Sequence, residues 1–449
     1  MFLLRVIEMK RTLTKSIKIV TINLLLLVLL LETASIALYF HHTRKFFYTA
    51  NKSEVGTNTM LSNNELFDDG GPATLNRILH PYLGFVYDEH ARIRLQFSDV
   101  EYAPNNLGIF SPYDYPFKKT SSDQFIVGIF GGSVAMYYGF YELEHHVLVS
   151  ALKRLPYFKN KQIIVLPFAA GSYKQPQQLL ELNYVTSLGQ DFDLVINIDG
   201  FNETSLAYLN NKSGLDPSMP NIEMFGPLVR LANRNFSSDQ LNLSLQILQL
   251  KEELRDTRTS LLKCRIATCY TLRWTQLRYF LSQYQKKSEA FNRLARNENA
   301  RGSLVYVDKR DQPLDDAAVL AEISGVWAKS ELSMNELLTA KRIPYFAVVQ
   351  PNQYYSTGRK FTDAEKKILN CSTIYTEGVI KGYPALIAQL DDLKKSGVKV
   401  ISAVNAFDKV EDSVYVDACC HYNQAGNDVF AKFVAEQIVS SLQTQPGAR

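Results

Sequence analysis

Apolar and polar segments alternate regularly through two parts of the 449-residue chain. Short apolar runs, each followed by turn residues and then by a longer segment of mixed polarity, predict strands that alternate with helices. The predicted strands are Phe125–Phe130, Ile163–Phe168, Asp193–Ile198, Pro344–Val349 and Val398–Ala403. The predicted helices of these two parts are Leu143–Leu155, Gln175–Leu188, Tyr383–Ser396 and Gln424–Leu442. The alternation predicts an α/β protein, a three-layer α/β/α domain with a mostly parallel five-stranded sheet.

Between the third and fourth predicted strands the pattern changes. Residues 238–300 are rich in Leu, Gln, Glu, Lys and Arg, and apolar positions such as Leu241 and Leu245 recur at roughly helical spacing. A further helix is predicted over Leu314–Lys341. We interpret residues 211–341 as a helical insertion that caps or flanks the sheet, with a coiled-coil dimerisation arm as the alternative.

The N-terminal segment has the pattern of a membrane anchor. Ile19–Phe40 is a run of 22 residues that is largely apolar, and as a helix it would be about 33 Å long, against about 30 Å of hydrocarbon in a bilayer. Basic residues precede it at five positions: Arg5, Lys10, Arg11, Lys15 and Lys18. Basic residues before a span favour a cytoplasmic N-terminus. We therefore expect residues 1–18 to be cytoplasmic, residues 19–40 to be a transmembrane signal-anchor, and the rest of the chain to be extracytoplasmic, in the periplasm or at the cell surface.

Two polar residues, Asn23 and Glu32, interrupt this apolar run. An acid deep in a bilayer costs on the order of 2–3 kcal/mol unless it is shielded. Glu32 therefore leaves a second interpretation open, a secretory signal with its apolar core at Ile19–Leu31 and a cleavage site near Ser35–Ala37. The uncleaved anchor is favoured because apolar residues resume at residue 36.

The net charge bears on the class of binding partner. The net charge of +4 is small for this length and gives no support for nucleic-acid binding, which usually requires a concentrated basic face.

Residues 41–100 are interpreted as a stalk and N-terminal extension. Residues 101–210 and 342–449 are the two parts of the α/β domain, on either side of the insertion.

Five cysteines are present, which is compatible with disulfides outside the cytoplasm. Cys264 and Cys269 are a possible local pair, and Cys371 with Cys419 or Cys420 a possible long-range pair. The odd number leaves one thiol over. The sequence has no Cys-x-x-Cys, His-Glu-x-x-His or phosphate-loop pattern, so a zinc ribbon, a metalloprotease and an NTPase are disfavoured.

Three consecutive predicted strands end in small or polar residues. The first ends in Gly131-Gly-Ser133, the second is followed by Gly171, and the third is followed by Gly200-Phe-Asn202. Because the carboxyl ends of parallel strands meet at one edge of a sheet, we expect these residues to lie together where open α/β folds bind ligands. The Ser133 hydroxyl is a candidate nucleophile. The Ser133 amide, the Gly171 amide and the Asn202 side-chain amide are suitable donors to an oxyanion.

A candidate general base lies near the C-terminus. Of the seven histidines, only His421 combines a nearby acid, a loop and a following helix. It belongs to the segment Asp417-Ala-Cys-Cys-His421. A serine, a histidine and a carboxylate form a catalytic triad when they meet in space, so we expect Ser133, His421 and Asp417 to act as nucleophile, base and orienting acid.

These blocks resemble the SGNH (GDSL-type) hydrolase superfamily. That family has its nucleophilic serine after the first strand, a glycine after the second, Gly-x-Asn after the third and Asp-x-x-His before the last helix; the matching residues here are Ser133, Gly171, Asn202, Asp417 and His421. The first block here is Gly-Gly-Ser instead of Gly-Asp-Ser. The last has three residues between the acid and the histidine instead of two, which bears on the role of Asp417 more than on that of His421. The resemblance implies a flavodoxin-like SGNH hydrolase fold.

The resemblance also implies a function. We expect an extracytoplasmic serine esterase that hydrolyses an ester-linked acyl group, acetyl by preference, on a surface glycan or lipid, with no metal or organic cofactor. An O-acyltransferase that uses the same residues is one alternative. A non-catalytic glycan-binding or assembly module is the other. Neither the acceptor of the acyl group nor the oligomeric state follows from the sequence.

Overall fold

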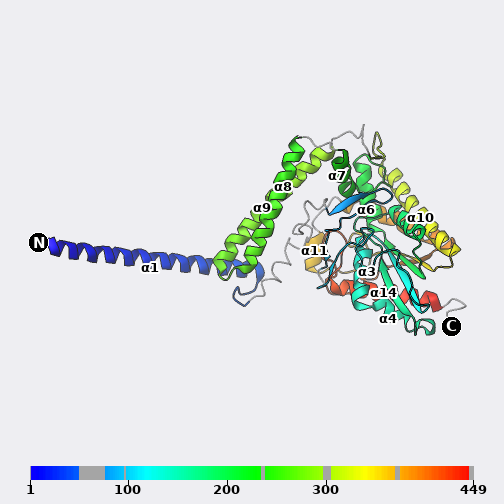
Figure 1. The fold of residues 1–449 in the computed structure, drawn as a ribbon, viewed down its shortest axis with the longest axis horizontal. Helices are drawn as coiled ribbons and strands as arrows, with labels where there is room; N and C mark the ends of the chain where they lie inside the picture. The colour runs from blue at the N-terminus through cyan, green and yellow to red at the C-terminus, as the bar shows by residue number, and fades with distance from the viewer. Residues whose placement is uncertain are drawn as a thin grey trace. The chain divides into compact units, whose positions relative to one another are not determined.

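A computed structural model describes most of the chain. The described residues are 2–49, 76–95, 98–233, 238–296, 305–369 and 375–443. The chain divides into two compact units, one made of residues 1–72 with 237–294 and the other of residues 73–236 with 295–449. Figure 1 labels the helices and strands of both.

The second unit contains a five-stranded parallel sheet. Its strands are β5 (Gln124–Gly131), β6 (Gln162–Pro167), β7 (Leu194–Asp199), β8 (Tyr345–Val349) and β9 (Lys399–Ser402). They lie in the order β6-β5-β7-β8-β9, and all four neighbouring pairs are parallel. This confirms the α/β class and the five predicted strands, each within one residue or two at its ends. The direction in which strands are added reverses between β5 and β7, and open α/β sheets bind ligands at the carboxyl ends beside such a point.

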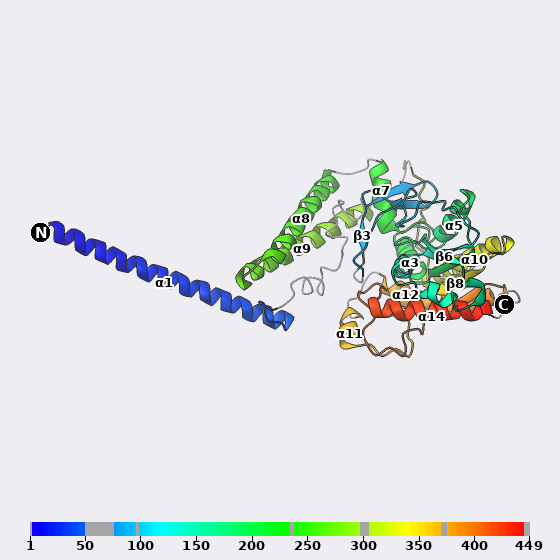
Figure 2. The same cartoon turned by 60° about the horizontal axis from the view of Figure 1, so that its bottom comes forward.

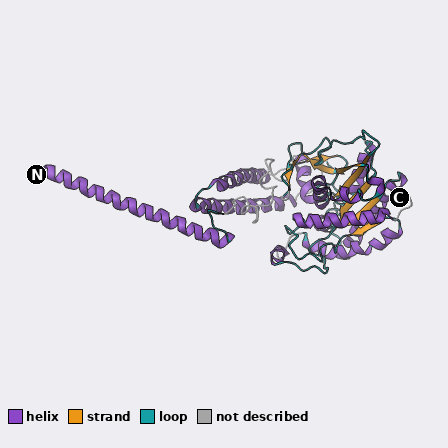
Figure 3. Ribbon diagram, turned by 90° about the horizontal axis from the view of Figure 1, so that it is seen from below, coloured by secondary structure: helices purple, strands orange, loops and turns teal. Residues whose placement is uncertain are grey.

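Helices lie on both sides of these strands (Figure 3). One group, in which α14 contacts the other two, is α3 (Ser133–His145), α4 (Val147–Leu152) and α14 (Gln424–Gln443). A second group, joined through contacts with α10, is α5 (Gln177–Ser187), α6 (Phe201–Lys212), α10 (Asp316–Ala340), α12 (Thr376–Ala388) and α13 (Leu390–Lys395). The other helices among the described residues of this unit are η2 (Pro156–Phe158), α7 (Ile222–Asn233) and α11 (Asp363–Leu369).

Two helices differ from the prediction. The helix predicted at Leu143–Leu155 is instead divided at His146 between α3 and α4. Helix α3 begins ten residues before Leu143, at Ser133, because it is buried along most of its length and so lacks the polar stripe that marks a surface helix. The predicted helix Tyr383–Ser396 is instead two helices, α12 and α13, that start at Thr376.

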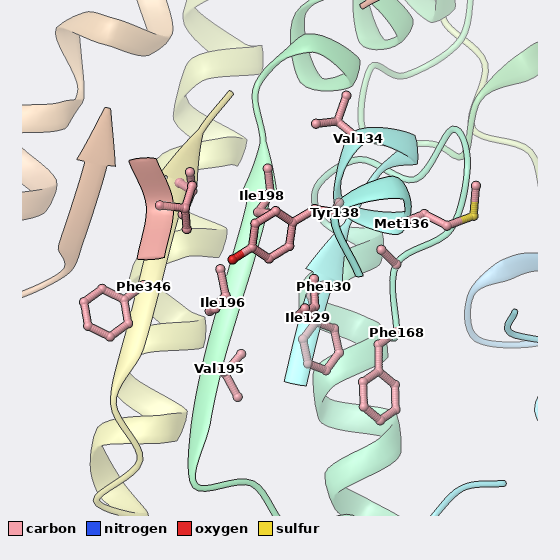
Figure 4. Packing of buried hydrophobic residues seen from close by; sticks show 14 of the residues in the cluster. Ile129, Phe130, Val134, Met136, Tyr138, Phe168, Val195, Ile196, Ile198 and Phe346 are labelled. Carbon is pink, nitrogen blue, oxygen red and sulfur yellow. The ribbon is translucent and has the colours of Figure 1, made fainter. Parts of the chain in front are cut away.

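The core of the sheet unit is apolar and continuous. β5 and β7 are buried at every position. Figure 4 shows Phe130 and Ile198 from these strands together with Tyr138 of α3 and Phe346 of β8, and all four are at most 1% exposed. Each such side chain stabilises the fold by roughly 1.5–3 kcal/mol relative to exposure, which fixes α3 against the strands that carry the candidate site.

The segment before the sheet belongs to the same unit. It forms two antiparallel hairpins, β1 (Arg77–His80) with β2 (Gly84–Tyr87), and β3 (Ile93–Arg94) with β4 (Glu101–Tyr102). Phe85, Val86 and Tyr87 are buried in the core of the sheet unit. Residues 76–95 and 98–100 of the predicted N-terminal extension are therefore built into the domain, whereas its residues 41–49 belong to the unit of α1. The middle of the predicted stalk, residues 50–75, lies outside the described residues.

The first unit is helical over most of its described residues. It contains α1 (Phe2–Thr43) and a hairpin of α8 (Ser238–Lys263) and α9 (Ala267–Arg296), which lie side by side in Figures 1 and 2. The predicted insertion, residues 211–341, is thus divided. α7 and α10 belong to the sheet unit, where Trp327 of α10 is fully buried, and only the α8–α9 hairpin belongs to the unit of the N-terminal helix.

Helix α1 contains a stretch, Lys18–His41, of 24 residues and mean hydropathy 2.3, which is long and apolar enough to cross a membrane. Its membrane topology and the location of the sheet unit remain expectations. The predicted pair Cys264–Cys269 forms a disulfide. Cys371, the expected partner of Cys419 or Cys420, lies outside the described residues.

The turn after β5 gives the first prediction. Gly131 has φ +138°, and a Cβ there would lie 2.1 Å from the Ile198 carbonyl oxygen. We expect Gly131→Ala to reduce the free energy of unfolding by roughly 2–5 kcal/mol, from backbone strain and overpacking together. The control is Gly325→Ala on α10, where no atom lies within 4 Å of the added Cβ. Thermal unfolding of the full chain in detergent measures both; equal melting temperatures would contradict the prediction.

Candidate active site at the carboxyl edge of the sheet

Ser133 follows a tight turn at Gly131 and Gly132, where the neighbouring atoms leave no room for a side chain. β5 ends at Gly131, and Ser133 is the first residue of α3. A Cβ on Gly132 would lie 2.3 Å from Nδ2 of Asn202, so glycine is required for this close approach. The first N–H groups of a helix have no acceptor within the helix. This turn therefore brings a hydroxyl together with the backbone donors at the start of α3.

The loop before α14 is folded around the Asp417 carboxylate. Its Oδ1 accepts the backbone N–H groups of Cys419 at 2.9 Å, Cys420 at 3.1 Å and His421 at 3.3 Å. Burial alone would raise the pKa of Asp417, but the charge of the His421 imidazole and these hydrogen bonds outweigh it, and the net pKa is lowered. Asp417 is thus held as a carboxylate by the turn that the three intervening residues form.

The three predicted residues of the triad meet. Nε2 of His421 lies 2.7 Å from Oγ of Ser133, and Nδ1 lies 2.6 Å from Oδ2 of Asp417. The imidazole also stacks on Tyr137, one turn along α3 from Ser133, with ring centroids 4.8 Å apart. The extra residue between Asp417 and His421 does not keep the carboxylate from the imidazole. A hydroxyl, an imidazole and a carboxylate in this order allow the imidazole to take the hydroxyl proton while the carboxylate stabilises the resulting cation.

Asn202 lies at the same edge. It is the second residue of α6, directly after β7, and is 8% exposed. One N–H of its Nδ2 donates to the Tyr173 carbonyl at 2.8 Å, and the same nitrogen faces the backbone of Gly132. An amide nitrogen carries two hydrogens, so the second is available beside the Ser133 corner.

Gly171 differs from the expectation. Its N–H donates to the Tyr87 hydroxyl at 2.9 Å, so this amide already has a partner. Tyr87 comes from β2, and the same hairpin accepts hydrogen bonds at Phe85 O and Leu83 O from Tyr173 and Gln177. Nothing in the sequence pattern indicated that this hairpin would dock on the second strand end.

The side chain of Glu203 forms hydrogen bonds to two of the loops that follow the strands. The sequence prediction did not include this residue. One carboxylate oxygen accepts the Gly200 N–H at 2.6 Å and the other accepts the Gln175 N–H at 3.1 Å. Burial raises the pKa of Glu203 to about 7, although these backbone hydrogen bonds favour its charged form. The four-residue Gly200–Glu203 spacing is that of a helix cap and was the available signal.

A wider set of buried polar groups continues this network. Asn197 donates to Asp199 at 2.9 Å and to Glu331 at 2.8 Å, and the Trp327 indole donates to Asp199 at 2.9 Å. Burial, with the neighbouring carboxylates, raises the pKa of Asp199 well above its usual range. Gln178 joins this set to Glu203, since it donates to Glu203 at 3.1 Å and accepts from Asn197 at 2.9 Å, so the buried polar groups form one connected layer.

The thiols of Cys419 and Cys420 are unoxidised and lie 3.7 Å apart. With His421 they form the one cluster of possible metal ligands found among the described residues, all ligand atoms lying within 4.8 Å of one another. Both ring nitrogens of His421 are engaged by Ser133 and Asp417, so a metal would compete with the triad.

Comparison with known protein families gives no match for this chain, and comparison with curated proteins gives none either.

Glu203→Gln tests the role of the buried carboxylate. Between pH 4.5, the ordinary pKa of a glutamate, and about 7, its pKa here, the folded state keeps a proton that the unfolded chain releases. Stability from this group therefore falls as the pH rises through that window. Glutamine does not titrate, so we expect the advantage of the wild type over Glu203→Gln in unfolding free energy to be largest near pH 4.5 and to shrink towards pH 8.

Denaturant unfolding at several pH values measures this difference, with the exposed Glu411→Gln as control. A difference that stays constant with pH would show that Glu203 has no raised pKa in the folded protein.

Proposed function

We propose that this protein is a membrane-anchored serine esterase of the SGNH type. The observation that carries the proposal is the chain of hydrogen bonds Ser133–His421–Asp417 at the carboxyl edge of a parallel sheet. The strand order β6-β5-β7-β8-β9 supports a flavodoxin-like arrangement, because it is the order 2-1-3-4-5 of that class. The four sequence blocks at the strand ends and before α14 support the superfamily.

In the proposed reaction, Ser133 Oγ attacks the ester carbonyl and its proton passes to His421 Nε2. The tetrahedral oxyanion accepts hydrogen bonds from the Ser133 amide and from the free N–H of Asn202. The intermediate collapses when His421 gives the proton to the leaving alcohol, and the acyl group stays on Ser133. Water, deprotonated by His421, then attacks the acyl-enzyme; the bond to Ser133 Oγ breaks, His421 returns the proton to Oγ, and the acid is released. Asp417 holds the imidazole and stabilises its cation in both halves.

The proposed role of Gly171 changes with the geometry. Its N–H is bound to the Tyr87 hydroxyl, which is thereby an acceptor; that hydroxyl donates its own hydrogen to the Met136 thioether at 3.9 Å, a weak acceptor that an oxyanion would replace. We assign Gly171 the role of positioning Tyr87. In the family pattern the glycine amide is one of the oxyanion donors, and we assign that role here to the Tyr87 O–H.

The substrate proposal rests on location. With a cytoplasmic N-terminus and α1 across the membrane, the sheet unit would act on acyl esters at the outer face, on a surface glycan or lipid. The triad is equally suited to passing the acyl group to a sugar hydroxyl, so transfer is an outcome that the assay must separate from hydrolysis.

Fluorophosphonate labelling and turnover of a small aryl acetate by the full chain in detergent test this function. We expect one labelled residue, Ser133, and a loss of kcat/KM of roughly three orders of magnitude or more in Ser133→Ala. Ser150→Ala, an exposed serine on α4, is the control. A wild type that neither labels nor turns over would favour the non-catalytic module. Turnover that rises strongly on addition of a glycan acceptor would identify a transferase.

Asn202→Ala tests the oxyanion donor. We expect kcat to fall by about 10²–10³-fold with little change in KM, because the hydrogen bond forms only in the transition state. The matched control is Asn210→Ala on the same helix. Asn210 is also buried and donates to a backbone carbonyl, that of Met219, at 2.7 Å. Both variants should lose stability, but only Asn202→Ala should lose rate per folded molecule; equal rates would remove Asn202 from the proposed site.

A further inference from the structure

Glu32 is an acid within the apolar stretch of α1, and the structure gives it partners. Its carboxylate accepts the backbone N–H groups of Ala267 at 2.6 Å and Thr268 at 2.9 Å, and the Thr268 hydroxyl at 2.7 Å. Ala267 and Thr268 are the first two residues of α9. Glu32 therefore serves as a capping group supplied by another helix, at the end of α9 where backbone donors are unpaired and negative charge is favoured.

Aromatic packing continues this contact. Tyr39 of α1 packs edge-on against Tyr270 of α9 at 5.0 Å and against Phe47 at 5.1 Å. The Cys264–Cys269 disulfide closes the connection between α8 and α9 at this point. We call residues 261–274 the hairpin tip; it is fastened to α1 by hydrogen bonds and by an apolar cluster.

The position of Glu32 fixes the depth of the tip. Glu32 lies 14 residues after Lys18 and nine before His41, the ends of the apolar stretch. At 1.5 Å per residue it is about 21 Å from one end and about 14 Å from the other, within the length needed to cross about 30 Å of hydrocarbon. If α1 spans the membrane, the tip must reach the leaflet on the side of His41, because it is bonded to Glu32.

The exposed side chains of the hairpin tip are of the kinds found in segments that bind at a membrane interface. Its exposed apolar side chains are Leu262, Ile266 and Leu272, which are 43%, 51% and 67% exposed. Its exposed charged side chains are Lys263, Arg265 and Arg273, and residues 261–274 contain no acid. Apolar side chains beside basic ones are the composition of interfacial membrane-binding segments, and each basic residue near an anionic surface contributes about 1 kcal/mol.

We propose that the hairpin tip is a second membrane-binding element, which enters the leaflet on the side of His41 and binds anionic phospholipid headgroups. The proposal rests on α1 being a membrane span. In this arrangement the Glu32 carboxylate is shielded from lipid by its own hydrogen-bond donors, and the basic residues of the tip extend their long side chains from this depth towards the headgroups, so that their stems cover apolar surface.

The test uses the full chain in lipid nanodiscs that contain a phospholipid with a photoactivatable acyl chain. After illumination, reduction and trypsin digestion, mass spectrometry compares two peptides, residues 19–44 from α1 and residues 266–273 from the tip. We expect both to be labelled, and the label on the tip peptide to rise with the fraction of anionic lipid. Label on the α1 peptide alone overturns the tip proposal and leaves the span intact. Label on neither peptide contradicts the span, and the tip proposal falls with it.

Two variants sharpen the result. Leu272→Asp should reduce labelling of the tip peptide by about fivefold or more, because it places a charge in the interface. Leu245→Asp on α8, an equally exposed leucine outside the tip, should not. Glu32→Gln has one acceptor oxygen where the carboxylate has two, and should weaken tip labelling while the α1 peptide stays labelled. If Leu272→Asp and Leu245→Asp label alike, lipid does not contact the tip.

Discussion

The candidate site depends on the tight turn after β5. There the β5 backbone lies so close to the β7 backbone and to one side chain of α6 that no Cβ atom fits between them. Gly131 pairs with Ile198 across the sheet, and its Cα faces the Ile198 carbonyl so closely that no Cβ fits. Gly132 meets the amide of Asn202 in the same way. Because Ser133 comes directly after these two residues, its position is set by the contacts that Gly131 and Gly132 make with Ile198 and Asn202. Catalytic geometry that must hold within fractions of an ångström is better fixed by such contact than by flexible loops.

The polar layer under this corner serves position more than stability. Buried carboxylates such as Glu203 and Glu331 cost free energy to desolvate, and apolar residues of the same size would often be as stable. What apolar residues cannot do is hold two backbone N–H groups from different loops at one point, as Glu203 holds those of Gly200 and Gln175. The raised pKa of Glu203 reflects the free energy of burying its charge. In return, the carboxyl group links the loop after β7 to the loop after β6.

The strands were predictable because each is an apolar run that ends in Gly, Pro or a polar residue, and their parallel order then placed Ser133 and Asn202 on one edge. Contacts that join distant segments were not predictable. Tyr87 reaches Gly171 across 84 positions, and nothing in the local pattern of either residue indicates this bond. The start of α3 was missed because burial removes its polar face. The division of the insertion was missed because α10 and the α8–α9 hairpin share helical periodicity but differ in which surface they cover.

The same reasoning bears on Glu32, which in the sequence alone argued against an anchor. An isolated acid in an apolar run disfavours a membrane span, and it left cleavage near Ser35–Ala37 as an alternative. In the structure its carboxylate satisfies two backbone donors of α9, so removal of residues before the cleavage site would leave those donors without this acceptor. Ser35 and Tyr39, on either side of that site, are buried within the unit that the hairpin forms with α1. The acid is thus better explained as the link between α1 and the hairpin.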